Sequence, residues 1–296
     1  MNAVEQDQHP FRRFLRFRLR TFLVVFTIVS VWFGLRLRTA REQHAAVIAL
    51  SEIESNRSSV AYEYGYDFDR SGNVVPNADP PGPNLLYRGA RQHFFARVVG
   101  VSLDGTRAAD ADLRHLAKLP HLTRLDLEYT SVTDSGLEFV IRRFPDLTRL
   151  DVQSTQVTSK GLQHVGTLRE LRYLLFGQSP FSDTDFQHFS QLTSLEAIKA
   201  SDAELDGSGL RHLKSLPRLS SLDLRKNPIS DPNLAHLIAL RALKRLSLRG
   251  SAITDEGVQQ ICRLTTLREL DVAKTKISPE GLERIQLALP KCTIQN

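Results

Sequence analysis

The C-terminal two thirds of the chain repeats itself every 24 residues. Counting positions from the first residue of each unit, positions 1, 4, 6, 11, 16 and 19 are apolar in every unit. All 48 of these residues are apolar, whereas the chain's 41% apolar content predicts about 20 by chance. A unit this short cannot bury its own apolar side, so the units must stack in a row and share one core. The eight units, with one spacing of 25, begin at Val98, Leu122, Leu147, Leu171, Leu195, Leu219, Leu243 and Leu267.

Each unit is predicted to fold as a strand, a turn and a helix. Positions 1 to 6 follow the pattern LxxLxL, which is typical of a short strand with inward-facing leucines. Pairs such as Thr133-Asp134 and Thr254-Asp255 follow the turn, and we interpret their second residue as the helix N-cap, where an oxygen accepts free amides. Stacking then gives a curved α/β solenoid with parallel strands on the concave face and helices on the convex face.

The N-terminal segment contains an uncharged apolar run from Thr21 to Leu35. As a helix it spans about 23 Å, and flanking arginine stems extend it toward the ~30 Å of a bilayer core. A buried soluble helix and a cleaved signal peptide are the alternatives. Close bracketing by arginine disfavours the first, and the lack of an Ala-x-Ala site disfavours the second. We predict an uncleaved anchor at residues 21–37.

The charge of the chain is concentrated around this run. Residues 1–41 hold eight Arg and two acids, whereas the remainder holds 31 basic and 31 acidic residues, so all of the +6 lies at the N-terminus. A nucleic-acid-binding domain would carry its own excess of basic charge, so no nucleic-acid partner is predicted. Five Arg precede the run and three follow it, which places the N-terminus in the cytoplasm and the repeats on the far, periplasmic or extracytoplasmic, side.

The chain therefore divides into six predicted parts. They are a basic cytoplasmic segment (1–20), the transmembrane anchor (21–37), a helical stalk (38–55), a Pro/Gly-rich linker (56–84), an aromatic N-terminal cap (85–97) and the repeat domain (98–296), which ends in a short stub.

The motif LxxLxLxxT followed by Thr-Asp-x-Gly-Leu resembles the leucine-rich-repeat family, in the subclass found in F-box-associated repeat proteins. The resemblance covers residues 98–294. The whole layout, with its Arg-rich anchor, stalk, linker and terminal Leu-Pro-x-Cys, is similar to membrane-anchored leucine-rich-repeat proteins of planctomycete bacteria. The resemblance implies protein–protein interaction rather than catalysis.

A column of histidines at position 18 is the one candidate for metal chemistry. Metal binding needs ligands that converge on one ion, whereas helices of adjacent units lie about 8–10 Å apart, so we predict no metal site. The sequence also shows no phosphate loop or nucleophile elbow, and we predict no enzyme activity, cofactor or small-molecule substrate. The column consists of His115, His164, His188, His212 and His236.

The concave face should carry positions 3, 5 and 7 of each unit. Most are charged, which fits a solvated sheet face. Tyr173 and Leu175 interrupt the charges, as an apolar spot with charged rims does at an interface hot spot, although local packing of a degenerate unit is the alternative. The predicted binding residues are Arg124, Asp126, Arg149, Asp151, Tyr173, Leu175, Lys199, Asp223, Arg225, Arg245, Arg249 and Asp271.

These observations predict a membrane-tethered, non-catalytic module that binds a protein partner of unknown identity on its concave face. A structural envelope protein without a dedicated ligand is the main alternative. A substrate receptor of a ubiquitin-ligase-type complex, suggested by the F-box-associated relatives, would need a ligase-docking domain, and residues 1–97 offer an anchor and a linker instead.

Overall fold

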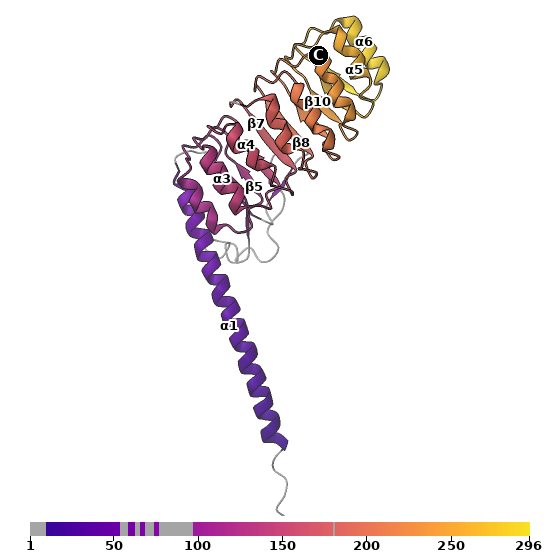
Figure 1. Cartoon of the computed structure of the whole chain (residues 1–296). Coiled ribbons are helices and arrows are strands. Elements are labelled where there is room, and N and C mark those ends of the chain that lie inside the picture. The colour runs from indigo at the N-terminus through magenta and orange to yellow at the C-terminus, as the bar shows by residue number, and fades with distance from the viewer. Residues whose placement is uncertain (1–9, 54–58, 63–65, 69–73, 77–96, 180) are drawn as a thin grey trace, which may run out of the picture.

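The structure is a computed structural model that describes residues 10–53, 59–62, 66–68, 74–76, 97–179 and 181–296. A long helix, α1, leads into a curved solenoid whose strands and helices lie in two layers (Figure 1). Most of the predicted linker, and all of the predicted cap except Arg97, lies outside the described residues, and so do the aromatic residues of the cap.

The strands form one continuous ten-stranded sheet in the order β1-β4-β5-β6-β7-β8-β9-β10-β11-β12. Strand β1 (Ser59–Tyr62) pairs antiparallel with β4, and all later pairs are parallel. A separate hairpin joins β2 (Tyr66–Phe68) to β3 (Val74–Pro76). The remaining strands are β4 (Val98–Ser102), β5 (Arg124–Asp126), β6 (Arg149–Asp151), β7 (Tyr173–Gly177), β8 (Ala197–Ser201), β9 (Ser221–Asp223), β10 (Arg245–Ser247), β11 (Glu269–Asp271) and β12 (Thr293–Gln295).

The convex layer differs from the expected row of α-helices, because four units cross back through 3-10 helices alone. The two ten-residue α-helices, α3 and α6, lie in the two crossovers of 25 residues, Leu122 to Leu147 and Leu267 to Cys292. A 3-10 helix rises about 2.0 Å per residue against 1.5 Å for an α-helix, so it spans the same distance with fewer residues. The layer contains η3 (Asp112–Lys118), α3 (Asp134–Arg143), α4 (Ser159–Val165), η4 (Asp183–Phe189), η5 (Ser208–Ser215), η6 (Asp231–Ala239), η7 (Asp255–Gly257), α5 (Val258–Cys262) and α6 (Pro279–Ala288).

The six apolar columns of the sequence form one core between the two layers, as predicted. Every column residue is buried except Ile277 and Leu282, which pack on the core from the last unit. The fourth unit fills its share with aromatic rings: Phe176 contacts Phe186 edge-on with ring centres 6.0 Å apart, and Phe189 at 5.5 Å. The core is therefore continuous along the solenoid, and all units contribute to it.

A carboxylate at position 13 joins each typical unit to the next one. Asp134 accepts hydrogen bonds from the Thr158 backbone N–H and hydroxyl, both at 2.7 Å, and from the Gly161 N–H at 3.1 Å. Thr158 is itself the N-cap, since its hydroxyl accepts from the N–H of Lys160. The prediction that the Asp caps its own helix was therefore wrong: the threonine caps, and the aspartate reaches across to the following unit.

The glycine at position 15 leaves the space that this contact requires. A Cβ on Gly161 would lie 2.7 Å from Oδ1 of Asp134, which is closer than real Cβ atoms approach. We call this contact between the helical sides of two successive units a joint. The same pairing recurs at four other joints, where a Cβ on the glycine would collide with the aspartate of the preceding unit. These pairs are Asp110 with Gly136, Asp183 with Gly209, Asp231 with Gly257 and Asp255 with Gly281.

Two joints lack this aspartate, and at each of them the long polar side chain comes from the following unit instead. Ser159 replaces it in one unit, and the next unit has Asp185 in place of glycine; Asp185 accepts from the Ser159 hydroxyl at 2.6 Å. Gly207 replaces it in another, and Asn233 of the following unit donates to the Asp206 carbonyl at 2.9 Å. Every joint from the first unit to the eighth thus has one long polar side chain and one small residue facing it.

Helix α1 (Pro10–Ser51) is one unbroken element that contains the apolar run and the predicted stalk as far as Ser51. Among the described residues it is the one helix long and apolar enough to cross a membrane, and its apolar window is fully exposed. Its last turns behave differently. Ala40, Gln43, Ala46 and Leu50 are almost fully buried, and this part of α1 packs on η3 at the N-terminal end of the solenoid. The helix therefore covers the core of the first unit.

We predict that reversing a joint restores part of the stability that either single change removes. Asp134→Ser leaves the Thr158 amide and hydroxyl without their acceptor, and Gly161→Asp brings two carboxylates together, so each single change should destabilise the protein by about 1–3 kcal/mol. The combined variant reproduces the Ser159–Asp185 joint and should recover at least about 1 kcal/mol of the summed loss. Urea unfolding of the full chain in detergent measures this. Asp134→Ser combined with Gly209→Asp, which alters two different joints, is the control, and its losses should add.

We also predict that α1 stabilises the first unit through Leu50. Leu50 is 1% exposed, so Leu50→Ala should cost about 2–5 kcal/mol, whereas Ile48→Ala on the same helix removes a side chain that is 44% exposed. Stability in a solenoid is largely local, so hydrogen exchange should accelerate in η3 before later units in the Leu50 variant and remain unchanged in the Ile48 control. Equal exchange in both variants would show that α1 does not support the solenoid.

Candidate functional site

The strand register lines up equivalent positions of successive units on the concave face. Arg124 pairs with Arg149, and Arg149 with Tyr173, in the row of position 3. In the row of position 5, Asp126 pairs with Asp151, and Asp151 with Leu175. Like charges of β5 and β6 therefore lie side by side on the concave face.

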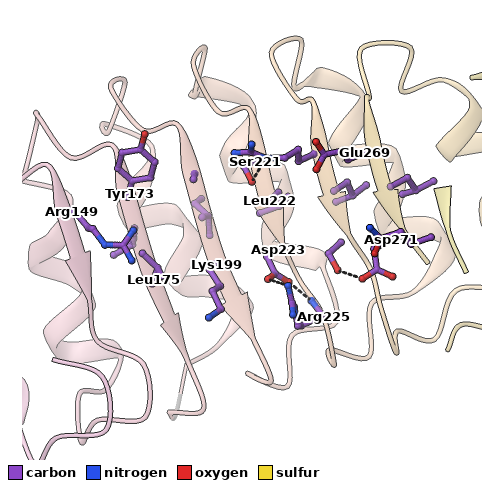
Figure 2. Close-up of a pocket in the computed structure, with 18 residues that line it drawn as sticks. Arg149, Tyr173, Leu175, Lys199, Ser221, Leu222, Asp223, Arg225, Glu269 and Asp271 are labelled. Carbon is purple, nitrogen blue, oxygen red and sulfur yellow. Dashed lines mark hydrogen bonds and ion pairs between the residues drawn. The ribbon is translucent and has the colours of Figure 1, made fainter. Parts of the chain in front are cut away.

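A shallow groove with a volume of about 410 Å³ runs over the concave face from β6 to β12 (Figure 2). We call this surface the concave groove. Arg124, Asp126, Asp151 and Arg249 of the predicted set lie outside it. Eight of the predicted residues line it: Arg149, Tyr173, Leu175, Lys199, Asp223, Arg225, Arg245 and Asp271. It is also lined by Ala197, Ser221, Ser247, Glu269 and Gln295, of which the first four belong to the same rows of the repeat and were identifiable from it.

The C-terminal half of the groove contains charges that pair within the sheet. Arg225 donates to Asp223 from Nε at 2.9 Å and lies 2.7 Å from it through Nη2, and this hydrogen-bonded carboxylate raises the pKa of the Arg225 guanidinium. Asp271 accepts from the Ser247 hydroxyl at 3.2 Å and lies 3.8 Å from Arg249. These pairs hold their side chains in fixed positions.

The N-terminal part of the groove is apolar around β7. Tyr173 and Leu175 project from β7 toward the concave side, and Ala197 lies next to Tyr173 on β8 (Figure 2). The Tyr173 ring lies under the Arg172 guanidinium, 5.8 Å from it, and its hydroxyl is 3.4 Å from Glu196. We call Tyr173 and Leu175 the apolar step. It is the one place where the rows of charge are interrupted by two large apolar side chains.

Three carboxylates, Asp126, Glu128 and Asp151, meet beside the N-terminal end of the groove with oxygens within 4.8 Å of one another. We call them the acidic cluster; Glu128 was not in the predicted set. Burial, followed by the nearby charge of Asp126, raises the pKa of Asp151 to about 7. Burial also raises the pKa of Glu128. The Gln153 amide donates to both oxygens of Asp151, at 3.1 and 3.3 Å, which stabilises the crowded carboxylate.

The histidine column lies on the convex layer, partly exposed, away from the concave groove. His164 and His188 each have a ring nitrogen near the neighbouring glutamine amide, at 3.2 and 3.5 Å. Within the described ranges, the acidic cluster is the only group of three or more residues of metal-binding type whose ligand atoms come together. The structure thus places the histidines as separate surface residues of successive units.

Comparison with known proteins identifies the repeats. Residues 118–140, 240–262 and 263–285 match the family model described as leucine rich repeat. No curated protein matches the sequence. Among solved structures, an internalin of Listeria monocytogenes is 22% identical with a TM-score of 0.50; the match covers 62% of this chain and 49% of that one. The chain thus spans about half the length of this internalin. The likeness shows the fold, a leucine-rich-repeat solenoid.

Two further solved structures are similar at lower identity. A leucine-rich-repeat protein of Leptospira interrogans is 19% identical with a TM-score of 0.45, and the match covers 62% of this chain and 57% of that one. Internalin C2 of Listeria monocytogenes is 16% identical with a TM-score of 0.48, with 67% and 81% covered.

We predict that Asp151 makes the stability of the protein depend on pH. Its folded pKa of about 7 lies above the ordinary 3.8, so its favourable contribution is complete below pH 4 and is lost as the pH rises toward 7. Asp151→Asn should therefore raise the free energy of unfolding at pH 8 relative to the wild type. This difference between variant and wild type should be smaller at pH 4, and the change between the two pH values should be on the order of a few kcal/mol. Urea unfolding at both pH values measures it, with the exposed Asp146→Asn as the control. A variant less stable than the wild type at pH 8 would contradict the prediction.

Proposed function

We propose that this protein is a membrane-tethered, non-catalytic module that binds a protein partner in the concave groove of its leucine-rich repeats. The observation that supports this most directly is the groove itself, open along seven strands with an apolar step among paired charges. Sites for small molecules are usually enclosed and mostly apolar, whereas extended concave surfaces of solenoids suit large partners. An apolar patch bordered by charged side chains is also typical of a protein interface.

The apolar run of α1 supports the proposed membrane anchor. Phe22, Val25 and Ile28 are all more than half exposed, which would be costly for a helix surrounded by water. Trp32 lies toward the end of the run with the Arg36 guanidinium 5.5 Å from its ring, an arrangement suited to the headgroup region. With five arginines before the run and three after it, we propose that the N-terminus is cytoplasmic and the groove lies on the far side.

The junction between anchor and solenoid adds to this proposal. The predicted anchor ends at residue 37, and Ala46 already belongs to the core of the solenoid, so only about 14 Å of helix separates the anchor from that core. The solenoid is therefore held close to the bilayer surface and is not suspended from a long free stalk. Its groove would meet partners that lie at or near the same membrane.

Photo-cross-linking of the full chain in its native cells tests the proposal. We expect a benzophenone residue at position 175 to form a discrete protein adduct, which identifies the partner. In the chain without benzophenone, Tyr173→Ala with Leu175→Ala should reduce co-purification of that partner at least about tenfold, as hot-spot residues do. A benzophenone residue at position 287 is the control, because Leu287 is 82% exposed but lies on the convex helix α6.

Protease added to spheroplasts, in which any outer layers are removed and the cytoplasmic membrane is intact, should destroy the adduct if the groove lies on the far side of that membrane. Survival of the adduct until the cytoplasmic membrane is breached would contradict the proposed orientation. Equal labelling from positions 175 and 287 would contradict the proposed site, and absence of any discrete adduct would favour a structural envelope role.

A further inference from the structure

The cations of the concave face differ in whether the solenoid already supplies them with a partner. Arg225 lies 2.7 Å from Asp223, and Arg249 lies 3.8 Å from Asp271, so both guanidinium groups have a carboxylate opposite them. Such pairs contribute little to an incoming ligand, because a new contact must first replace an existing one. The two cations on the strands that flank the apolar step are different.

Arg149, on β6, makes no hydrogen bond through its guanidinium group to any residue in the described part of the chain. The ion pair it forms there is a loose one to Asp151, at 4.0 Å, and its Nη1 is buried without a hydrogen-bond partner. Its side chain remains 14% exposed and lines the groove, so an incoming group can reach the side chain beside the buried Nη1. Charged donors in folded proteins are almost always hydrogen-bonded, so a guanidinium that makes no hydrogen bond within the described residues points to an acceptor that arrives from outside.

Lys199, on β8, is the matching cation on the other side of the apolar step. It forms no hydrogen bond or ion pair with the described residues, and only a longer-range attraction to Glu128 is present. Leu175 lies between the two strands, paired with Asp151 on β6 and with Lys199 on β8. Strands lie about 4.8 Å apart and Lys199 lies two residues further along its strand, so the two cations begin roughly 12 Å apart and their long side chains can approach one ligand group. Figure 2 shows both lining the groove on either side of Leu175.

We propose that the partner presents an acidic side chain to Arg149 and Lys199, next to an aliphatic or aromatic side chain that packs on Tyr173 and Leu175. This inference rests on the proposed function and specifies the chemistry of the partner. The carboxylate supplies the acceptor that Arg149 lacks, and its apolar neighbour covers the step. A bound acid flanked by a hydrophobic residue is thus the central feature of the recognised segment.

The charge of the acidic cluster beside Arg149 affects how tightly this carboxylate of the partner binds. Asp151 is the member closest to Arg149, and its pKa of about 7 leaves it partly protonated near neutral pH. Asp126 is held by the Ser102 hydroxyl at 3.0 Å, and Glu128 is the third acid that faces the site. Protonation of Asp151 removes repulsion from an incoming acid. Binding should therefore tighten as the pH falls from 8 to 6.

Selection from a library of random twelve-residue peptides displayed on phage tests this inference, with the full chain held in lipid nanodiscs. We expect enriched peptides to share an Asp or Glu beside Leu, Ile, Phe or Tyr. Arg149→Met with Lys199→Met should weaken their binding at least about tenfold. Lys244→Met with Lys276→Met removes the same charge from exposed sites outside the groove and should change binding less than about twofold.

Each result bears on the proposal. Enrichment of basic or purely apolar peptides, equal weakening in the two double variants, or recovery of no groove-binding peptide would overturn it. Peptides that need Tyr173 and Leu175 but neither cation would leave the groove as a binding site and reject only the acidic partner. The thermal midpoint of Arg149→Met alone gives a ligand-free readout: we expect it to equal or exceed that of the wild type, and a clear fall would show that Arg149 is satisfied within the fold.

Discussion

The contact between one unit and the next is the interaction on which the rest of this structure depends. A single unit has an apolar side that it cannot cover, so the core exists only where units are held in register. The aspartate at position 13 and the glycine that faces it fix that register at the convex edge. The β-ladder fixes it at the concave edge. Because both edges are set, equivalent side chains of successive strands line up in rows, and the concave face acquires a pattern that a partner can recognise.

The two exceptional joints show that this contact, and not the aspartate as such, is required. Where Ser159 or Gly207 stands in place of the aspartate, the long side chain comes from the following unit, as Asp185 or Asn233. The geometry demands one long polar residue and one small residue, and either unit can provide either. This explains why five glycines recur at one position while two polar residues interrupt the series.

Several features of the fold could be predicted from the sequence because they depend on periodicity. The apolar columns predicted the core, the order of strands and helices, and which residues share the concave face. Other features depend on distances between units that periodicity does not encode. The predicted capping role of Asp134 was wrong because an aspartate that caps its own helix and one that binds the next unit occur in the same sequence motif. The 3-10 helices follow from crossover length, and the burial of Gln43 and Leu50 depends on where α1 meets η3. Whether Arg149 or Arg225 has a partner depends on side-chain geometry alone.

Helix α1 has a further consequence for how the protein is made. A solenoid can begin to fold at any unit that has something to stack on, and chains emerge from the ribosome from the N-terminus onward. Here the segment that covers the first core is translated before any repeat exists. Each unit therefore emerges beside a surface that is already complete, and assembly proceeds in one direction from α1 toward β12. Exposure of unfinished apolar faces during synthesis is limited to the newest unit.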